Sequence, residues 1–301
     1  MNDLQSQSAS RTTRVDIIVP VRDEQDSVAR FVTAVASLTC PAAVEWRIIF
    51  VEDGSRDRTV DILSELSRCD PRVCYFSTAN GFGEGPAVMF GASRSDADAV
   101  IMMAADGSHP IDTIPRMIES FQNGCEVVQC TRASFRGRTW SRRTGSWLFG
   151  WMYRVLTGYR WEHQDTYYRL ASQRFVEEML KQPRYWRLIR FPLPTDASLC
   201  TLRVDMVERD HGASTYGFTR LLGLALDGVL ALMTWPRVAA IVAACFALAF
   251  VSLRSAWQVP AASAALAGSL MLGRYRWLDR ADYLGKLILK ESSMRDVRAL
   301  R

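Results

Sequence analysis

Short apolar runs and stretches of helical periodicity alternate along the first third of the chain. Four runs rich in β-branched residues predict buried strands over 15–21, 45–55, 73–78 and 98–106. Between them, apolar residues recur at helical spacing over 24–38, 58–68 and 86–94, which predicts three helices. This alternation is typical of a mostly parallel sheet covered by helices, so we expect an α/β fold.

The pattern changes from Leu221 onward, where the chain becomes almost continuously apolar. Residues 221–235 are apolar around most of a helix circumference, and charge-free runs follow over 238–253 and 256–273. Each run is close to the roughly 17 to 25 residues that cross a bilayer, so we expect a two-helix membrane hairpin, with buried soluble helices as the alternative. Arginines are more frequent outside the hairpin than in its turn, which predicts that both chain ends face the cytoplasm.

These patterns predict five segments. They are a polar, disordered tail over 1–14, a catalytic domain over 15–218, a juxtamembrane amphipathic helix over 219–235, a transmembrane hairpin over 236–273 and a basic cytoplasmic tail over 274–301. The first segment has no apolar core region, so we expect no cleaved signal peptide.

Charge and cysteine content narrow the class of protein. A net charge of +5 and a pI near 8.9 are too mild for a dedicated nucleic-acid binder but permit attraction to anionic lipid. The seven cysteines form no C-x-x-C pair and lie in apolar segments, which predicts reduced thiols in a cytosolic environment. The three histidines show no zinc-ligand spacing, and we expect His109 and His211 to make local structural hydrogen bonds.

Acidic residues follow two of the predicted strands directly. Glu52 and Asp53 end the second strand, and Asp106 ends the fourth. In open α/β sheets, ligands bind beyond the carboxyl ends of the strands, so these acids are expected on one ligand-binding face. The glycine-rich stretch 80–86 fits neither a dinucleotide fingerprint nor a phosphate-binding P-loop, and we interpret it as a turn close to a ligand.

Several motifs together resemble one enzyme family. The stretch 16–32 and the segment FVEDGSRDRTVDIL resemble the opening motifs of inverting family-2 glycosyltransferases with the GT-A fold. The segment ERDHGASTYGF, before the apolar region, is similar to the Arg-x-x-Gly-Glu-Ser-Lys-Tyr motif of polyprenyl-phosphate glycosyltransferases of the dolichol-phosphate mannose synthase type. The resemblance covers about 15–290 and implies a GT-A catalytic domain followed by a juxtamembrane helix and two transmembrane helices.

The chain matches these motifs only in part. The positions that agree are Pro20, Glu24, Asp53, Gly54, Ser55, Asp106, Arg209, Gly212, Ser214 and Tyr216. Where the family has Asp-x-Asp-x-Gln-x-Pro, this chain has Ala104, Asp106, Ser108 and Pro110, so the first acid and the Gln are missing. Other departures are Arg22, Asp23, Glu52, Ala213 and Thr215. These departures imply weaker donor or metal binding, an unusual sugar, or loss of activity.

The resemblance implies a set of site residues. The expected nucleotide-sugar contacts are Pro20, Val21, Arg22, Glu24, Glu52, Asp53, Gly54, Gly83, Ala105 and Asp106. Asp106 and Ser108 are the expected ligands of Mg²⁺ or Mn²⁺, because Mg²⁺ is often held by one or two carboxylates plus substrate phosphates. The residues expected at the reaction centre are Asp106, Arg132, Arg169, Arg209 and Ser214. Arginine suits the bidentate phosphate contacts that two anionic substrates require.

The expected function is transfer of one sugar from a nucleotide-sugar to a polyprenyl phosphate, with inversion, by an integral protein of the bacterial inner membrane. A family-2 enzyme with another acceptor, such as a growing glycan, and a silent nucleotide-sugar-binding membrane protein are the alternatives. A processive synthase is disfavoured because Thr157 stands where its Gln-x-x-Arg-Trp signature needs Gln. The sequence leaves open the sugar, the lipid length and whether the protein forms a homo-oligomer.

Overall fold

A computed structural model provides the structure of this protein. It describes residues 12–41, 43–78, 81–133, 151, 155, 165–181, 198–206, 230, 235–253, 266–274 and 289–292. The predicted tail over 1–14 and juxtamembrane helix over 219–235 therefore lie almost entirely outside the described residues.

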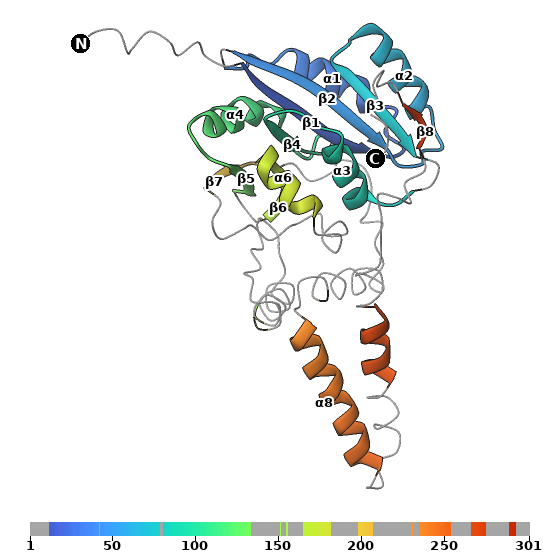
Figure 1. The fold of residues 1–301 in the computed structure, drawn as a ribbon. Coiled ribbons are helices and arrows are strands. Elements are labelled where there is room, and N and C mark those ends of the chain that lie inside the picture. The colour runs from blue at the N-terminus through green and yellow to red at the C-terminus, as the bar shows by residue number, and fades with distance from the viewer. Residues whose placement is uncertain are drawn as a thin grey trace, which may run out of the picture.

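The centre of the molecule is one eight-stranded sheet with the order β7-β5-β6-β4-β1-β2-β3-β8 (Figure 1). Its strands are β1 (Thr13–Val21), β2 (Val44–Glu52), β3 (Val73–Thr78), β4 (Ala99–Met102), β5 (Val127–Arg132), β6 (Asp165–Ser172), β7 (Leu199–Val204) and β8 (Leu289–Ser292). The predicted parallel unit is confirmed, because β1 pairs in parallel with both β2 and β4, and β2 with β3. The first strand starts slightly before the expected domain boundary at residue 15, since β1 begins at Thr13.

Helices cover both faces of this sheet, which makes a three-layer α/β/α arrangement. On one face pack α1 (Val28–Ala36), α2 (Thr59–Cys69) and α4 (Ile114–Gln122), which follows the 3-10 turn η1 (Ile111–Thr113). On the other face pack α3 (Glu84–Ser93) and α6 (Gln173–Leu180). The sheet residues are buried on both faces: Ile17 and Phe50 join the first core, and Ile18 and Val51 join the second. This two-sided burial explains the continuous apolar runs of the central strands.

The sheet also contains pairings that the sequence analysis did not predict. β6 runs antiparallel to its neighbours β4 and β5, and β8 runs antiparallel to β3. β8 belongs to the segment expected only as a basic tail, so that expectation was incomplete: four tail residues extend the sheet at the edge next to β3. β3 leads into the glycine-rich stretch 80–86, so β8 lies beside the strand that precedes this stretch.

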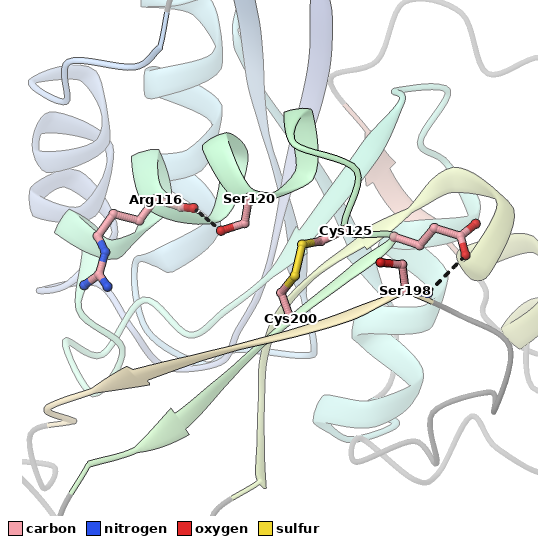
Figure 2. Close-up of a disulfide and its surroundings, with 6 residues drawn as sticks. Arg116, Ser120, Cys125, Ser198 and Cys200 are labelled. Carbon is pink, nitrogen blue, oxygen red and sulfur yellow. Dashed lines mark hydrogen bonds between the residues drawn. A yellow bond between two sulfur atoms is a disulfide. The ribbon is translucent and has the colours of Figure 1, made fainter.

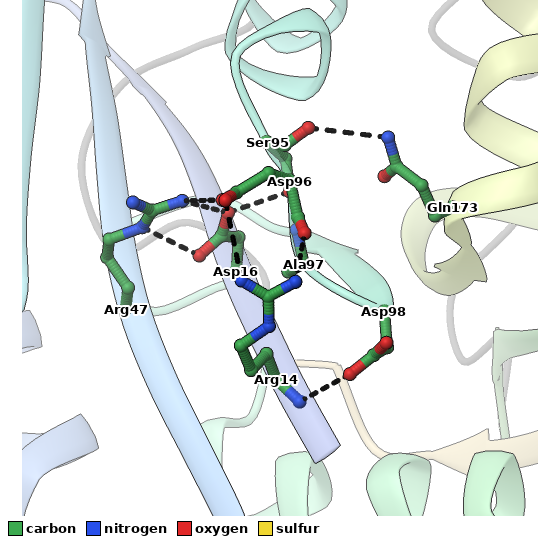
Figure 3. Close-up of polar contacts among 8 residues, drawn as sticks. All are labelled: Arg14, Asp16, Arg47, Ser95, Asp96, Ala97, Asp98 and Gln173. Carbon is green, nitrogen blue, oxygen red and sulfur yellow. Dashed lines mark hydrogen bonds and ion pairs between the residues drawn. The ribbon is translucent and has the colours of Figure 1, made fainter. Parts of the chain in front are cut away.

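A polar network closes the sheet at the amino ends of its central strands (Figure 3). The Asp16 carboxylate accepts hydrogen bonds from Arg47 Nε at 2.9 Å, Arg47 Nη2 at 2.7 Å and Ser95 Oγ at 2.7 Å. Arg47 also reaches Asp96 at 3.0 Å, and Arg14 pairs with Asp96 at 3.4 Å. Hydrogen bonding with buried Asp16 raises the pKa of Arg47, so the guanidinium stays charged. The network therefore stabilises the end of the sheet opposite the predicted ligand-binding face.

A disulfide joins Cys125 to Cys200, so the prediction of seven reduced thiols is wrong for this pair (Figure 2). β5 and β7 pair in parallel with Val128 opposite Cys200, which brings Cys125, just before β5, next to Cys200. The bond spans 75 residues of sequence, so spacing alone could not indicate it. The other five cysteines are free, as predicted, and burial raises the pKa of Cys130 to about 12, which keeps that thiol protonated.

Beyond the sheet, α8 (Trp235–Leu253) lies beside the helical residues 266–274 (Figure 1). The two helices approach closely at Gly268: a Cβ added there would lie 3.2 Å from Cys245 Cβ and 3.7 Å from Phe246 Cε2. Phe246, Leu266 and Leu270 are exposed apolar side chains on this pair. Within the described residues, no helix combines the length and the apolar character needed to cross a bilayer.

Candidate active site

Asp106 lies in a tight loop that follows β4 at the carboxyl end of the sheet. The strand is held beside β1 until Met103, whose N–H donates to Ile18 O at 3.2 Å. Gly107 then turns the chain with a φ of +79°, a conformation that glycine adopts without a steric penalty. Asp106 Oδ1 accepts from Ser108 N at 3.0 Å and from Ser108 Oγ at 2.5 Å. The loop thus presents a half-buried carboxylate next to a hydroxyl, the pair predicted as metal ligands.

The two residues before Asp106 are buried on opposite faces of the sheet. Ala104 packs in the core beneath α3 and α6, and Ala105 packs in the core beneath α1 and α4. Ala104 occupies the position where the motif has its first acid, so an apolar contact replaces a carboxylate there. The described residues accordingly contain no group of three or more His, Cys, Asp or Glu side chains that could hold a metal.

Asp53 links three of the strand ends that form this face. Its N–H donates to Val21 O at 3.0 Å, and its carboxylate accepts from Phe82 N and Gly83 N, each at 2.7 Å. Burial raises the pKa of Asp53, although the two backbone donors and the nearby Arg22 cation act in the opposite direction. Asp53 therefore joins β1, β2 and the described part of the glycine-rich stretch, and the prediction that this stretch lies close to a ligand stays a prediction.

The Glu52 side chain is buried and contacts the turn after β2 and the neighbouring strand β3. Its carboxylate accepts hydrogen bonds from Ser55 N and, at 2.6 Å, from Ser77 Oγ on β3. Its backbone oxygen accepts from Thr78 Oγ1 at 3.1 Å. The turn at Gly54, with a φ of +78°, lies between Glu52 and Ser55. Glu52 thus holds the turn after β2 against β3, and its predicted contact with the nucleotide stays a prediction.

The loops after β1 and β2 are connected by reciprocal hydrogen bonds. Asp23 N donates to Ser55 Oγ at 3.0 Å, and Asp23 Oδ1 accepts from Arg56 N at 2.7 Å. Glu24 N donates to Thr59 Oγ1 at 2.9 Å. Asp23 has a φ of 54°, in the left-handed region where Asn and Asp are the favoured non-glycine residues. These bonds hold the predicted donor-binding residues from Pro20 to Glu24 as one unit with the turn at Gly54.

The structure describes three of the predicted arginines, Arg22, Arg132 and Arg169. The Arg22 guanidinium lies over Gly81, where an added Cβ would be 2.5 Å from Arg22 Nη1. Arg169 is only 1% exposed and pairs across the sheet with Met102, at the carboxyl end of β4. Arg132 ends β5 opposite Val204 of β7 and is partly exposed. The roles of Arg132 and Arg169 in phosphate binding remain predictions.

Arg209, His211 and Ser214 lie outside the described residues. The described part of the predicted site comprises the expected nucleotide-sugar and metal contacts together with two of the arginines expected at the reaction centre: Pro20, Val21, Arg22, Glu24, Glu52, Asp53, Gly54, Gly83, Ala105, Asp106, Ser108, Arg132 and Arg169.

His109 makes the local hydrogen bond that the sequence predicted, by accepting Ala104 N–H on Nδ1 at 3.0 Å. The sequence did not indicate its partner Tyr168, whose ring stacks on His109 with centroids 4.8 Å apart. No sequence pattern connects two residues so far apart; only the position of β6 beside β4 brings them together.

An open α/β sheet with acidic residues beyond the carboxyl ends of its parallel strands is typical of nucleotide-binding α/β proteins of the doubly wound type. The chain belongs to glycosyl transferase family 2, whose family model matches residues 16–203. It is therefore a glycosyltransferase with the predicted GT-A fold.

Relatives of known name resemble much of the chain. The bactoprenol glucosyl transferase of Shigella phage SfX is 28% identical over 249 residues, which cover 82% of this chain and 81% of that protein. The undecaprenyl-phosphate 4-deoxy-4-formamido-L-arabinose transferase of Pseudomonas aeruginosa (strain LESB58) is 30% identical over 240 residues, with 78% and 70% covered. Mannosyl-3-phosphoglycerate synthase from Rubrobacter xylanophilus has the same fold, with a TM-score of 0.50 at 16% identity over 73% of this chain and 72% of that one.

Proposed function

We propose that this protein transfers a single sugar from a nucleotide-sugar to a polyprenyl phosphate. The observation that carries the proposal is the family membership of residues 16–203 together with two relatives whose names specify a bactoprenol or undecaprenyl-phosphate acceptor. The similarity to these relatives covers at least 78% of the chain, well beyond the acidic motifs.

The nucleotide-sugar donor is proposed to bind to the loops after β1, β2 and β3, which hydrogen bonds connect to one another. Asp53 fixes the glycine-rich turn through Phe82 N and Gly83 N, and the Arg22 cation lies beside it. A nucleotide bound over this unit would meet backbone that is already ordered by hydrogen bonds, which lowers the entropic cost of binding.

Asp106 and Ser108 fit a divalent cation by the chemistry of their donor atoms. Carboxylate and hydroxyl oxygens are hard ligands of the kind that Mg²⁺ and Mn²⁺ prefer, and substrate phosphates commonly complete the coordination of Mg²⁺. When bound, the cation would neutralise charge on the departing nucleoside diphosphate. The protein's own contribution is to hold the Asp106 carboxylate at a constant position at the end of β4.

The acceptor side needs cationic residues rather than a general base. A polyprenyl phosphate is already an oxyanion near neutral pH, so no histidine or carboxylate has to remove a proton. We propose that Arg132, Arg169, Arg209 and Ser214 bind and orient the two anionic substrates. Arginine can offer two parallel N–H donors to one phosphate, which fixes its orientation as well as its charge.

We also propose that α8 and residues 266–274 attach the enzyme to a membrane. Support comes from the charge-free runs over 238–253 and 256–273 and from the exposed side chains of Phe246, Leu266 and Leu270. Attachment at this place would keep the sheet beside the lipid that carries the acceptor. The proposed location is the bacterial inner membrane, with the catalytic domain on the cytoplasmic side.

Release of nucleoside diphosphate tests the proposed reaction with purified full chain in detergent. A panel of nucleotide-sugars is incubated with Mg²⁺ or Mn²⁺, with a polyprenyl phosphate or with soluble oligosaccharides as acceptor. We expect release that depends on the polyprenyl phosphate for at least one donor and is lost in Asp106→Asn. Release that depends on an oligosaccharide instead would identify a family-2 enzyme with another acceptor. Tight binding of a nucleotide-sugar without release of nucleoside diphosphate under all conditions would identify the alternative, a silent nucleotide-sugar-binding protein. Ala104, in place of the first acid of the family motif, motivates that alternative.

A further inference from the structure

We propose that His109 and Tyr168 are positioning residues that hold the Asp106 loop in the shape needed for metal and nucleotide binding. This inference rests on the proposed function, because it assigns Asp106 to the metal-bound donor. It adds a pair of residues that the family resemblance does not supply.

The first observation is a hydrogen bond that closes the loop around Asp106. Ala104 N–H, immediately after the β4 region, donates to His109 Nδ1 at 3.0 Å. Ala104 and His109 are both buried, with 6% exposed each. An acceptor Nδ1 requires a neutral imidazole that carries its proton on Nε2. The bond joins the two ends of a six-residue segment that contains the Asp106 carboxylate.

The second observation is that β6 holds the far end of the same loop. The Tyr168 ring stacks on the His109 ring with an interplanar angle of 9° and a centroid distance of 4.8 Å. The Tyr168 hydroxyl donates to Pro110 O at 2.8 Å. Burial strongly raises the pKa of Tyr168, so the phenol keeps its proton and remains a donor. The Tyr167 ring also contacts the His109 ring in a T-shaped arrangement, with centroids 4.9 Å apart.

Together these contacts fix both ends of the loop while the carboxylate between them stays half-buried. Met103 N bonded to Ile18 O fixes the entrance, and Pro110 O bonded to Tyr168 fixes the exit. Gly107, between these two ends, has a φ of +79° and no Cβ, so it can adopt a wider range of backbone conformations than the other loop residues. Asp106 carries the one carboxylate of the described loop 103–110, so its orientation determines whether this loop can hold the metal.

Substitution of His109 separates this role from a purely structural one. His109→Leu fills the space but leaves Ala104 N–H buried without its acceptor, whereas His109→Asn offers a side-chain oxygen at a similar distance from the backbone. Tyr168→Phe keeps the ring stack and removes only the hydroxyl. Val73→Ala, at the start of β3 and away from the loop, is the matched control for lost core stability.

The test is calorimetry of the full chain with Mn²⁺ and a nucleoside diphosphate, UDP and GDP in turn, each titrated with and without the other. We expect wild type and Val73→Ala to bind nucleotide more tightly with Mn²⁺ than without it. His109→Leu should lose about tenfold or more of that enhancement while its metal-free nucleotide affinity stays within about twofold, because the enhancement requires the metal that Asp106 is proposed to hold. His109→Asn should retain most of the enhancement, and Tyr168→Phe should be intermediate.

Wild-type enhancement in a folded His109→Leu protein would overturn the inference, as would a wild-type protein without any enhancement. Failure of the proposed function gives a different result. In that case the wild-type protein binds nucleotide more tightly with Mn²⁺ but transfers no sugar to a polyprenyl phosphate. If His109→Leu fails to fold, the comparison of Tyr168→Phe with wild type decides: unchanged enhancement in Tyr168→Phe would then overturn the inference.

Discussion

The buried pair of Asp16 and Arg47 provides a quantitative test of what holds the sheet together at its amino ends. The Asp16 side chain is 3% exposed and accepts three hydrogen bonds, whereas the Arg47 side chain is 29% exposed. Asp16→Ala leaves the guanidinium and the Ser95 hydroxyl without this acceptor. Loss of one partner from a buried ion pair typically costs about 3 to 5 kcal/mol. Asp96 remains 3.0 Å from Arg47, so we expect the lower end, about 3 kcal/mol.

An exposed pair of the same chemistry is the matched control. Arg72 and Asp70 are 2.8 Å apart with side chains 47% and 25% exposed, so Asp70→Ala should cost at most about 1 kcal/mol. The free energy of unfolding is measured for each variant of the full chain by denaturant titration followed by circular dichroism. Equal losses in the two variants, or a loss below about 1 kcal/mol for Asp16→Ala, would refute the claim that this network stabilises the sheet.

Three further outcomes follow from particular contacts. Cys200→Ser should lower the free energy of unfolding by about 2 to 4 kcal/mol in oxidised protein and leave it unchanged under dithiothreitol, as measured by thermal melting, since the lost bond spans 75 residues. Gly91→Ala should destabilise by about 1 to 3 kcal/mol, because its Cβ would lie 2.5 Å from Ile18 Cγ2 and 2.9 Å from Val51 Cγ2; an unchanged melting temperature would show that α3 can shift. The hydrogen bond from Arg72 holds the pKa of Asp70 below its usual range, so this carboxylate stabilises the fold above about pH 4 and loses that effect as pH falls. Asp70→Asn should therefore reduce the loss of unfolding free energy between about pH 4 and lower pH. The same pH dependence in wild type and variant would contradict a stabilising role of the ionised Asp70.

The parallel core of the fold was predictable because its strands are buried on both faces. Runs such as 17–21 and 99–105 are continuously apolar, and the helices between the strands repeat their apolar residues at helical spacing. The edges of the sheet carry no such pattern. β7 is mostly exposed or partly exposed along its length, and β8 is a polar segment of four residues that forms by pairing with β3. Their positions depend on contacts between segments far apart in the sequence.

The same distinction applies to the site. Asp53 and Asp106 were predictable because acids at the ends of apolar runs are brought together by parallel strands. The disulfide between Cys125 and Cys200 was not, because it depends on the register between β5 and β7. Tyr168 was not predictable either, since its contact with His109 depends on β6 inserting beside β4.

The most direct test of the proposed function is the chemical identity of the product. Membranes from cells that produce the full chain or Asp106→Asn are incubated with a panel of radiolabelled nucleotide-sugars, and label is counted in lipid extracted with organic solvent. The proposal predicts that one sugar enters the lipid fraction with the wild-type chain only and is released by mild acid, as expected of a sugar linked to a polyprenyl phosphate. Label that stays in the aqueous phase for every donor, or that enters lipid equally with Asp106→Asn, would contradict it.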